Sequence, residues 1–98
     1  MQVITVNNIV VDSNCYLVFV DQEPKVLARK EFELIRLLAT YADQVITRKM
    51  IFSEIWEDNL HIGERTIDVH IRKIRQKTGI KNIRTVKGVG YILERELH

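Results

Sequence analysis

Hydrophobic residues in the first part of the chain gather in short runs that are mostly β-branched or aromatic, a pattern typical of β-strands. The runs cover residues 2–6, 9–12, 16–20 and 25–27. Turn-forming residues separate them, at positions 7–8, 12–14 and 21–24. This part of the chain is therefore predicted to form a small antiparallel meander of four strands.

From residue 30 onward the apolar residues follow the spacing of amphipathic α-helices. Residues 30–41 carry a wide apolar stripe, which predicts a deeply packed helix. After a short extended segment at 45–46, a second helix is predicted over residues 48–56, with Thr47 as its N-cap. A third helix is predicted over residues 64–78, where Gly79 suits a left-handed C-cap.

Two strand-like segments end the chain, at residues 82–86 and 91–95. The segment Lys87-Gly-Val-Gly90 joins them, and its two glycines allow a tight turn and a close approach to another chain segment. These features predict a hairpin. The predicted order of sheet, three helices and hairpin places the chain in the α+β class.

Size and charge narrow the picture. A chain of 98 residues with 46% hydrophobic and 29% charged residues has the ordinary composition of a single globular domain. Residues 1–63 carry six basic and nine acidic residues, a charge of −3, whereas residues 64–98 carry nine and four, a charge of +5. Between Arg65 and Lys87 there are eight basic residues and one acid. Such a cluster suits a polyanionic partner, although a solvated basic face fits the charge alone equally well.

Some locations and chemistries are disfavoured by the sequence. No apolar run approaches the ~18 residues that cross a bilayer, and no signal peptide is visible. Cys15 is the one cysteine, which excludes an internal disulfide and favours a reducing compartment. We therefore expect a cytoplasmic protein with no membrane partner.

The third predicted helix has an apolar side and a basic side when its residues are placed at 100° intervals. The apolar stripe consists of Ile67, Ile71, Ile74 and Thr78. The opposite side holds Arg65, Val69, Arg72, Lys73 and Gln76, flanked by His70 and Lys77.

This helix suits the major groove of DNA. Long cationic side chains reach phosphates on both groove walls, Lys73 or Arg72 suits guanine, and Val69 suits a thymine methyl group. Amphipathic helices with outward basic residues are also common on proteins that bind no nucleic acid. The helix by itself leaves both interpretations open.

Two segments are more specific. Residues 65–75, RTIDVHIRKIR, and residues 83–91, IRTVKGVGY, resemble the DNA-binding effector domain of OmpR/PhoB-type response regulators, and the resemblance extends over nearly the whole chain. It implies a single winged helix-turn-helix domain over residues 1–98, with a four-stranded N-terminal antiparallel sheet (1–27), a three-helix core (28–79) and a C-terminal β-hairpin wing (80–98). It also implies sequence-specific binding to promoter DNA for transcriptional regulation, with a second copy of the domain on direct repeats.

The resemblance also implies particular contacts. Base edges would be contacted by Val69 and Lys73. Phosphates or the minor groove would be contacted by Trp56, Arg65, His70, Arg72, Arg75, Thr85, Lys87 and Tyr91. Arg75 projects nearer to the core side of the helix, and Trp56 fits a plain core residue equally well. The loop of Asp58, Asn59, Leu60, His61 and Ile62 matches the segment that family members use to touch RNA polymerase.

Two features depart from the family pattern. Family members often place Ser or Thr three residues before Glu at the start of the first helix, whereas Ala28 stands before Glu31, so half of this capping box is missing. The family also has an N-terminal receiver domain that a sensor kinase phosphorylates, and 98 residues do not hold it. We expect the chain to be a fragment of a longer regulator, with a free-standing effector domain as the alternative.

Other functions find less support in the sequence. The three histidines are dispersed and there is no cysteine pair, so no catalytic residue, metal site or cofactor is predicted. Asp68 and His70 lie two positions apart on a helix and point away from each other, and Asp68 is expected to pair with Arg72. The second hypothesis is a winged helix that binds a protein, but its third helix lacks the aromatic or Met anchors of such surfaces. RNA binding would call for aromatic stacking platforms.

Overall fold

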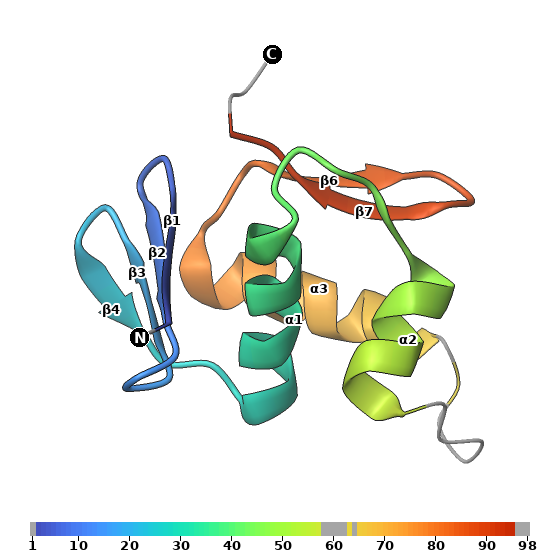
Figure 1. Cartoon of the computed structure of the whole chain (residues 1–98), viewed down its shortest axis with the longest axis horizontal. Coiled ribbons are helices and arrows are strands. Elements are labelled where there is room, and N and C mark those ends of the chain that lie inside the picture. Colours follow the sequence, from blue (N-terminus) through green and yellow to red (C-terminus); the bar gives the residue numbers. More distant parts are fainter. Residues whose placement is uncertain (1, 58–62, 64, 96–98) are drawn as a thin grey trace.

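The computed structural model describes residues 2–57, 63 and 65–95. Within these residues seven strands and three helices follow in the order β1–β4, α1, β5, α2, α3, β6, β7. Figure 1 shows the four N-terminal strands as one layer beside the helices, with the β6–β7 hairpin running above the helices in this view. The predicted α+β winged helix-turn-helix fold is confirmed.

The N-terminal sheet is an antiparallel meander of β1 (Val3–Val6), β2 (Ile9–Asp12), β3 (Leu17–Val20) and β4 (Glu23–Lys25), paired in chain order. Side chains on one face of the sheet are buried in the core. They are Val6, Ile9, Val11, Val18 and Val20. Because alternate residues of a strand point to opposite faces, the register holds this apolar set against the helices.

The position of β4 differs from the prediction. Asp21 and Gln22 have φ values of 52° and 70°, the left-handed conformation that both central residues of a two-residue type I′ hairpin turn adopt. Because the turn needs only these two residues, β4 starts at Glu23, and Pro24 lies inside it opposite Phe19. The predicted turn over 21–24 and the predicted strand over 25–27 were therefore wrong. Leu27 is buried in the connection to α1.

The three helices are α1 (Arg29–Thr40), α2 (Arg48–Trp56) and α3 (Arg65–Thr78). At the start of α2 the Thr47 hydroxyl accepts a hydrogen bond from the Met50 amide at 3.1 Å, which confirms this N-cap. At the start of α1 only the glutamate half of a capping box forms: the Ala28 amide donates to Glu31 Oε1 at 3.0 Å. Gly79 follows α3 with a φ of 72°, as its C-cap position requires.

The second sheet contains β5 (Ile46–Thr47), β6 (Ile83–Val86) and β7 (Gly90–Leu93), in the order β5-β7-β6. A Cβ atom on Gly90 would lie 2.0 Å from the carbonyl oxygen of Ile46, so β5 and β7 approach as closely as they do only because residue 90 is glycine. Gly88 has a φ of 75° in the β6–β7 turn, where the Val89 amide donates to the Val86 carbonyl at 2.9 Å. Through the pairing of β7 with β5, the hairpin is anchored to the segment that leads into α2.

Candidate nucleic-acid interface

Helix α3 has the two faces that its sequence predicts. Ile67, Ile71 and Ile74 are fully or almost fully buried, and the helix packs against α1. On the opposite side Arg72 and Lys73 are exposed, and Val69 between them is 36% exposed. The packing of the isoleucines therefore turns a face with two cations and one aliphatic side chain toward solvent.

Several basic side chains in this region have no polar partner within the described part of the chain. Within the described part of the chain, the side chains of Arg72, Lys73 and Lys87 make no ion pair or hydrogen bond. Lys87 is exposed in the turn between β6 and β7. Arg65, also exposed, interacts electrostatically with Asp68. Helix α3 and the hairpin turn together present positive charge that is available to an external anion.

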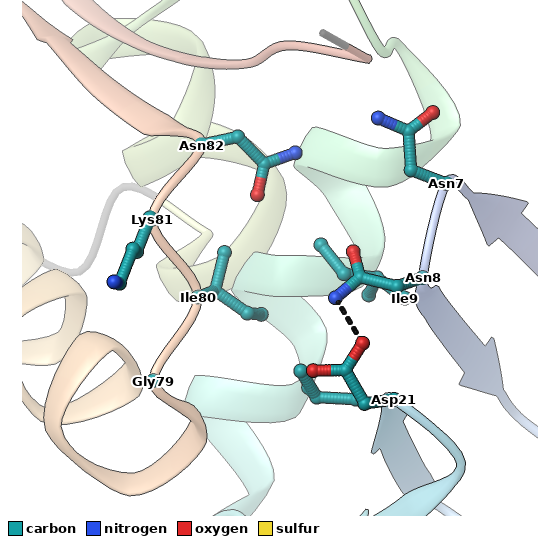
Figure 2. Close-up of a pocket in the computed structure, with 9 residues that line it drawn as sticks. Asn7, Asn8, Ile9, Asp21, Gly79, Ile80, Lys81 and Asn82 are labelled. Carbon is teal, nitrogen blue, oxygen red and sulfur yellow. Dashed lines mark hydrogen bonds between the residues drawn. The ribbon is translucent and has the colours of Figure 1, made fainter. Parts of the chain in front are cut away.

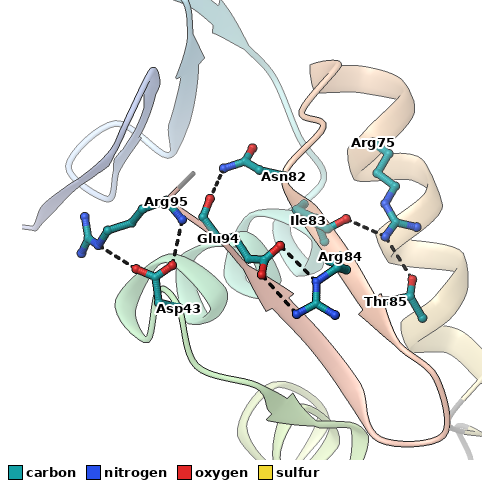
Figure 3. A network of polar contacts seen from close by, with 8 residues as sticks. All are labelled: Asp43, Arg75, Asn82, Ile83, Arg84, Thr85, Glu94 and Arg95. Atoms are coloured by element: carbon teal, nitrogen blue, oxygen red, sulfur yellow. Dashed lines mark hydrogen bonds and ion pairs between the residues drawn. The ribbon is translucent and has the colours of Figure 1, made fainter. Parts of the chain in front are cut away.

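Other basic residues of the cluster form internal contacts instead. The Arg75 guanidinium donates to the Ile83 carbonyl at 2.8 Å and to the Thr85 hydroxyl at 3.1 Å, and Figure 3 shows this side chain reaching from α3 to β6. Arg84 pairs with Glu94 across the hairpin at 3.0 Å. Arg75 and Thr85, both predicted to contact DNA, thus contact each other in this structure.

Asp68 has a different partner from the one expected. Its Oδ1 accepts a hydrogen bond from Arg48 Nη2 at 2.8 Å and another from the Tyr91 hydroxyl, so the expected pair with Arg72 was wrong. Burial opposes ionisation of Asp68, but the hydrogen bonds from Tyr91 and Arg48 outweigh it and lower the pKa of the carboxyl. Burial and the same hydrogen bond raise the pKa of Tyr91. The Tyr91 residue is 3% exposed, so it lies beneath the surface rather than on it.

Trp56 and His70 lie together where α2 meets α3. Trp56 is 7% exposed and stacks on Phe52 with a centroid distance of 6.1 Å. The half-buried ring of His70 meets the indole edge-on at 5.1 Å, and its Nδ1 donates to the Thr66 carbonyl at 2.7 Å. This bond orients the imidazole and makes Nδ1 the protonated nitrogen. The two side chains thus contact each other between α2 and α3.

Arg48 is a member of this region that the sequence pattern did not predict. Arg48 begins α2 and reaches Asp68 on α3, and its guanidinium carbon lies 5.3 Å from the centre of the Tyr91 ring. The hydrogen bond that it donates to Asp68 raises the pKa of this guanidinium. The position of Arg48 in the sequence indicates that it has a partner, because a cation in the first turn of a helix opposes the helix dipole and needs an acceptor elsewhere. The sequence showed no sign of which acceptor that would be.

Away from α3 the structure offers a different kind of surface. A cleft of about 290 Å³ lies between the turns of the N-terminal sheet and the segment that joins α3 to β6. Figure 2 shows Asn8 hydrogen-bonded to Asp21 on one side, with Lys81 and Asn82 on the other.

Among the described residues no cluster of His, Cys, Asp and Glu could hold a metal ion, and no helix is long and apolar enough to span a membrane. The predicted polymerase loop, Asp58 to Ile62, lies outside the described residues.

Comparison with known proteins adds the family. A family model described as "Transcriptional regulatory protein, C terminal" matches residues 22–93. The transcriptional regulatory protein PmrA of Pectobacterium parmentieri is 37% identical over 90 residues, which cover 92% of this chain and 40% of PmrA. The heme response regulator HssR of Staphylococcus aureus is 36% identical over 94 residues, 92% of this chain and 42% of HssR. The chain therefore spans about two fifths of the length of these relatives.

Solved structures agree with this assignment. The response regulator DrrB of Thermotoga maritima, an OmpR/PhoB homologue, aligns with a TM-score of 0.82 and 29% identity, covering 94% of this chain and 44% of DrrB. The DNA-binding domain of CpxR from E. coli aligns with a TM-score of 0.83 and 26% identity, covering 96% and 97%. The fold and the exposed basic helix define a winged-helix effector domain of the OmpR/PhoB class. The chain belongs to the family of C-terminal domains of transcriptional regulatory proteins.

Proposed function

We propose that this domain binds duplex DNA sequence-specifically to regulate transcription, with α3 in the major groove and the β6–β7 hairpin at the adjacent minor groove. The observation that carries the proposal is the solvent-facing side of α3. There Arg72 and Lys73 are exposed and unpaired among the described residues, with Val69 exposed between them. An α-helix fits the major groove, and this combination serves both phosphate contact and base recognition.

Each exposed side chain has a role in this proposal. Lys73 donates to guanine O6 and N7, and Val69 contacts a thymine methyl group. Arg65 and Arg72 contact phosphates on the groove walls, and Lys87 reaches the minor groove or its flanking phosphates. The remaining predicted contacts, Trp56, His70, Arg75, Thr85 and Tyr91, are buried or engaged within the domain. They act on DNA chiefly by holding the contacting elements in place.

The domain works with partners in this proposal. A single domain of this size buries a limited interface with DNA, so its affinity is modest and salt-sensitive. A second copy on a direct repeat raises the effective concentration and supplies further affinity. In the full-length protein a receiver domain, phosphorylated by a sensor kinase in the cytoplasm, promotes this pairing. The loop at 58–62 is the candidate contact with RNA polymerase.

The test is an amide NMR titration of the isotope-labelled domain with a pool of random short DNA duplexes at low salt. We expect shifts confined to residues 65–77 and 85–91, reversed by added salt because phosphate contacts release counterions. If these residues stay unshifted, or if shifts spread over β1–β4, DNA binding through α3 is excluded. The protein-binding winged helix would then become the hypothesis to test. A positive result leads to selection of the preferred duplex from a random library.

A further inference from the structure

A network of polar contacts joins α3 to the hairpin at both ends of the helix. We call it the helix–wing junction, and it consists of Arg48, Asp68, Arg75, Thr85 and Tyr91. In the first turns of α3, Asp68 accepts hydrogen bonds from Tyr91 on β7 and from Arg48 on α2. In its last turn, Arg75 donates to Ile83 and Thr85 on β6. One helix is thus tied to two strands of the same sheet.

The junction is built around the Tyr91 side chain. Its ring lies 5.3 Å from the Arg48 guanidinium carbon and 6.0 Å from that of Arg75, so two cations approach one aromatic ring. Its hydroxyl donates to Asp68. Hydrogen bonds and ring contacts of this kind are directional, whereas the packing of Ile67, Ile71 and Ile74 beneath α3 is not. The junction therefore restricts the orientation of the wing relative to α3 in a way that core packing does not.

An aspartate on a helix that binds DNA is unfavourable unless its charge stabilises the protein in another way. A carboxylate near phosphates is repelled by them, and an Asn at this position would avoid that cost. Here the Asp68 charge is balanced by Arg48 at 2.8 Å, and Asp68 is the single acid among eight basic residues between Arg65 and Lys87. Its carboxylate is used inside the protein, on Tyr91 and Arg48, while the unpaired cations face outward.

We propose that Asp68 is a positioning residue for DNA binding, which fixes the wing relative to α3 through Tyr91 so that Lys73 and Lys87 engage one duplex at the same time. This inference rests on the proposed function and goes further, because it assigns the cooperation between helix and wing to one carboxylate. It also assigns Tyr91 and Arg75, which sequence similarity implied as DNA contacts, to the internal scaffold of the interface.

The experiment is a double-mutant cycle with Asp68→Asn and Lys87→Ala, measured on a duplex that the wild-type domain selects from a random library. In the wild type, Lys87→Ala is expected to weaken binding about tenfold, because the wing is held in place for its contact. In the Asp68→Asn background the same change is expected to weaken binding less than about threefold, because the wing no longer reaches its contact in register. Asp68→Asn should bind unselected duplexes at least as well as the wild type does, since the external cations are retained and a charge that phosphates repel is removed.

Controls separate positioning from stability. Asp43→Asn removes a carboxylate that pairs with Arg95 at 3.1 Å, outside the junction, and should leave the Lys87→Ala effect at its wild-type size. Tyr91→Phe removes the hydroxyl and keeps the ring, so it should reproduce the Asp68→Asn result even if that variant folds poorly. If the effects of Asp68→Asn and Lys87→Ala simply multiply, and Tyr91→Phe gives the same result, the inference is wrong. If the wild type selects no duplex at all, the proposed function itself fails.

Discussion

Lys77, in the last turn of α3, pairs with Glu31, in the first turn of α1, with Nζ 2.8 Å from Oε1. The Glu31 residue is 2% exposed, and the same Oε1 accepts the Ala28 amide. Burial opposes ionisation of this carboxyl, but the hydrogen bonds from Lys77 and Ala28 outweigh it and lower its pKa below the ordinary value of 4.5. The glutamate of an incomplete capping box thus doubles as a link between two helices.

This link predicts a pH-dependent contribution to stability. Because the pKa of Glu31 is lowered on folding, its contribution is fully present above about pH 5 and is lost as the pH falls through the folded-state pKa. Glu31→Gln should lower the free energy of unfolding by about 2 kcal/mol at pH 7, since it weakens bonds to a charged group. The difference from wild type should shrink below about pH 4, as urea unfolding across this pH range would show.

A control on the same helix shows whether the effect is specific. Glu33 pairs with Arg29 at 3.6 Å and with Lys30 at 3.5 Å along the outside of α1. Glu33→Gln should cost less than about 0.5 kcal/mol, because its partners Arg29 and Lys30 are exposed to solvent and pairs of this kind contribute little. Equal losses for the two variants, or a Glu31→Gln difference independent of pH, would contradict the role given to the Glu31–Lys77 pair.

The two glycines of the wing should respond differently to alanine. In Gly90→Ala the new Cβ would meet the Ile46 carbonyl oxygen at 2.0 Å, so β5 and β7 must separate, at a cost of about 3 kcal/mol. In Gly88→Ala the new Cβ would meet no atom within 4 Å beyond its chain neighbours. The cost is then the strain of an alanine at a φ of 75°, about 1–2 kcal/mol. Thermal unfolding of the two variants tests this order, and a larger loss for Gly88→Ala would refute it.

The two faces of α3 should tolerate an acid very differently. Ile71 is 1% exposed, so Ile71→Asp buries an unpaired charge and should cost more than about 4 kcal/mol, enough to unfold most of the domain. Val69→Asp places the same side chain at a 36% exposed position and should keep the fold. Circular dichroism distinguishes the two. A folded Ile71→Asp variant would show that the helix is oriented differently from this structure.

Lys73 should matter for DNA and not for folding. Lys73→Glu is expected to weaken binding to the selected duplex by about tenfold to a hundredfold, because it removes a base donor and adds a repelled charge. Arg29→Glu makes the same change in net charge on α1, where its side chain is 78% exposed and an acid in the first helical turn is favourable. This control should bind nearly as the wild type does. Similar affinities for both variants would mean that net charge, and not the α3 face, governs binding.

Much of the fold follows from local sequence. The apolar stripes of the three helices, the Thr47 cap and the turn glycine Gly88 each act within a few residues, so their positions are legible in the order of the amino acids. The basic side of α3 follows in the same way, since the isoleucines that face the core leave Arg72 and Lys73 outside. The start of β4 was misplaced because Asp21 and Gln22 adopt left-handed conformations that their residue types permit but do not require.

The arrangement of the candidate site required the tertiary structure. From the sequence, Asp68 has a natural partner in Arg72 one helical turn away, yet its actual partners, Arg48 and Tyr91, lie 20 and 23 residues distant along the chain. The same holds for Lys77 with Glu31, which are 46 residues apart. Sequence by itself determined which side chains α3 exposes to solvent, because helical periodicity is a local property. Packing of the helices and strands decided which of the charged residues form ion pairs inside the protein, because these pairs depend on distances that no local pattern encodes.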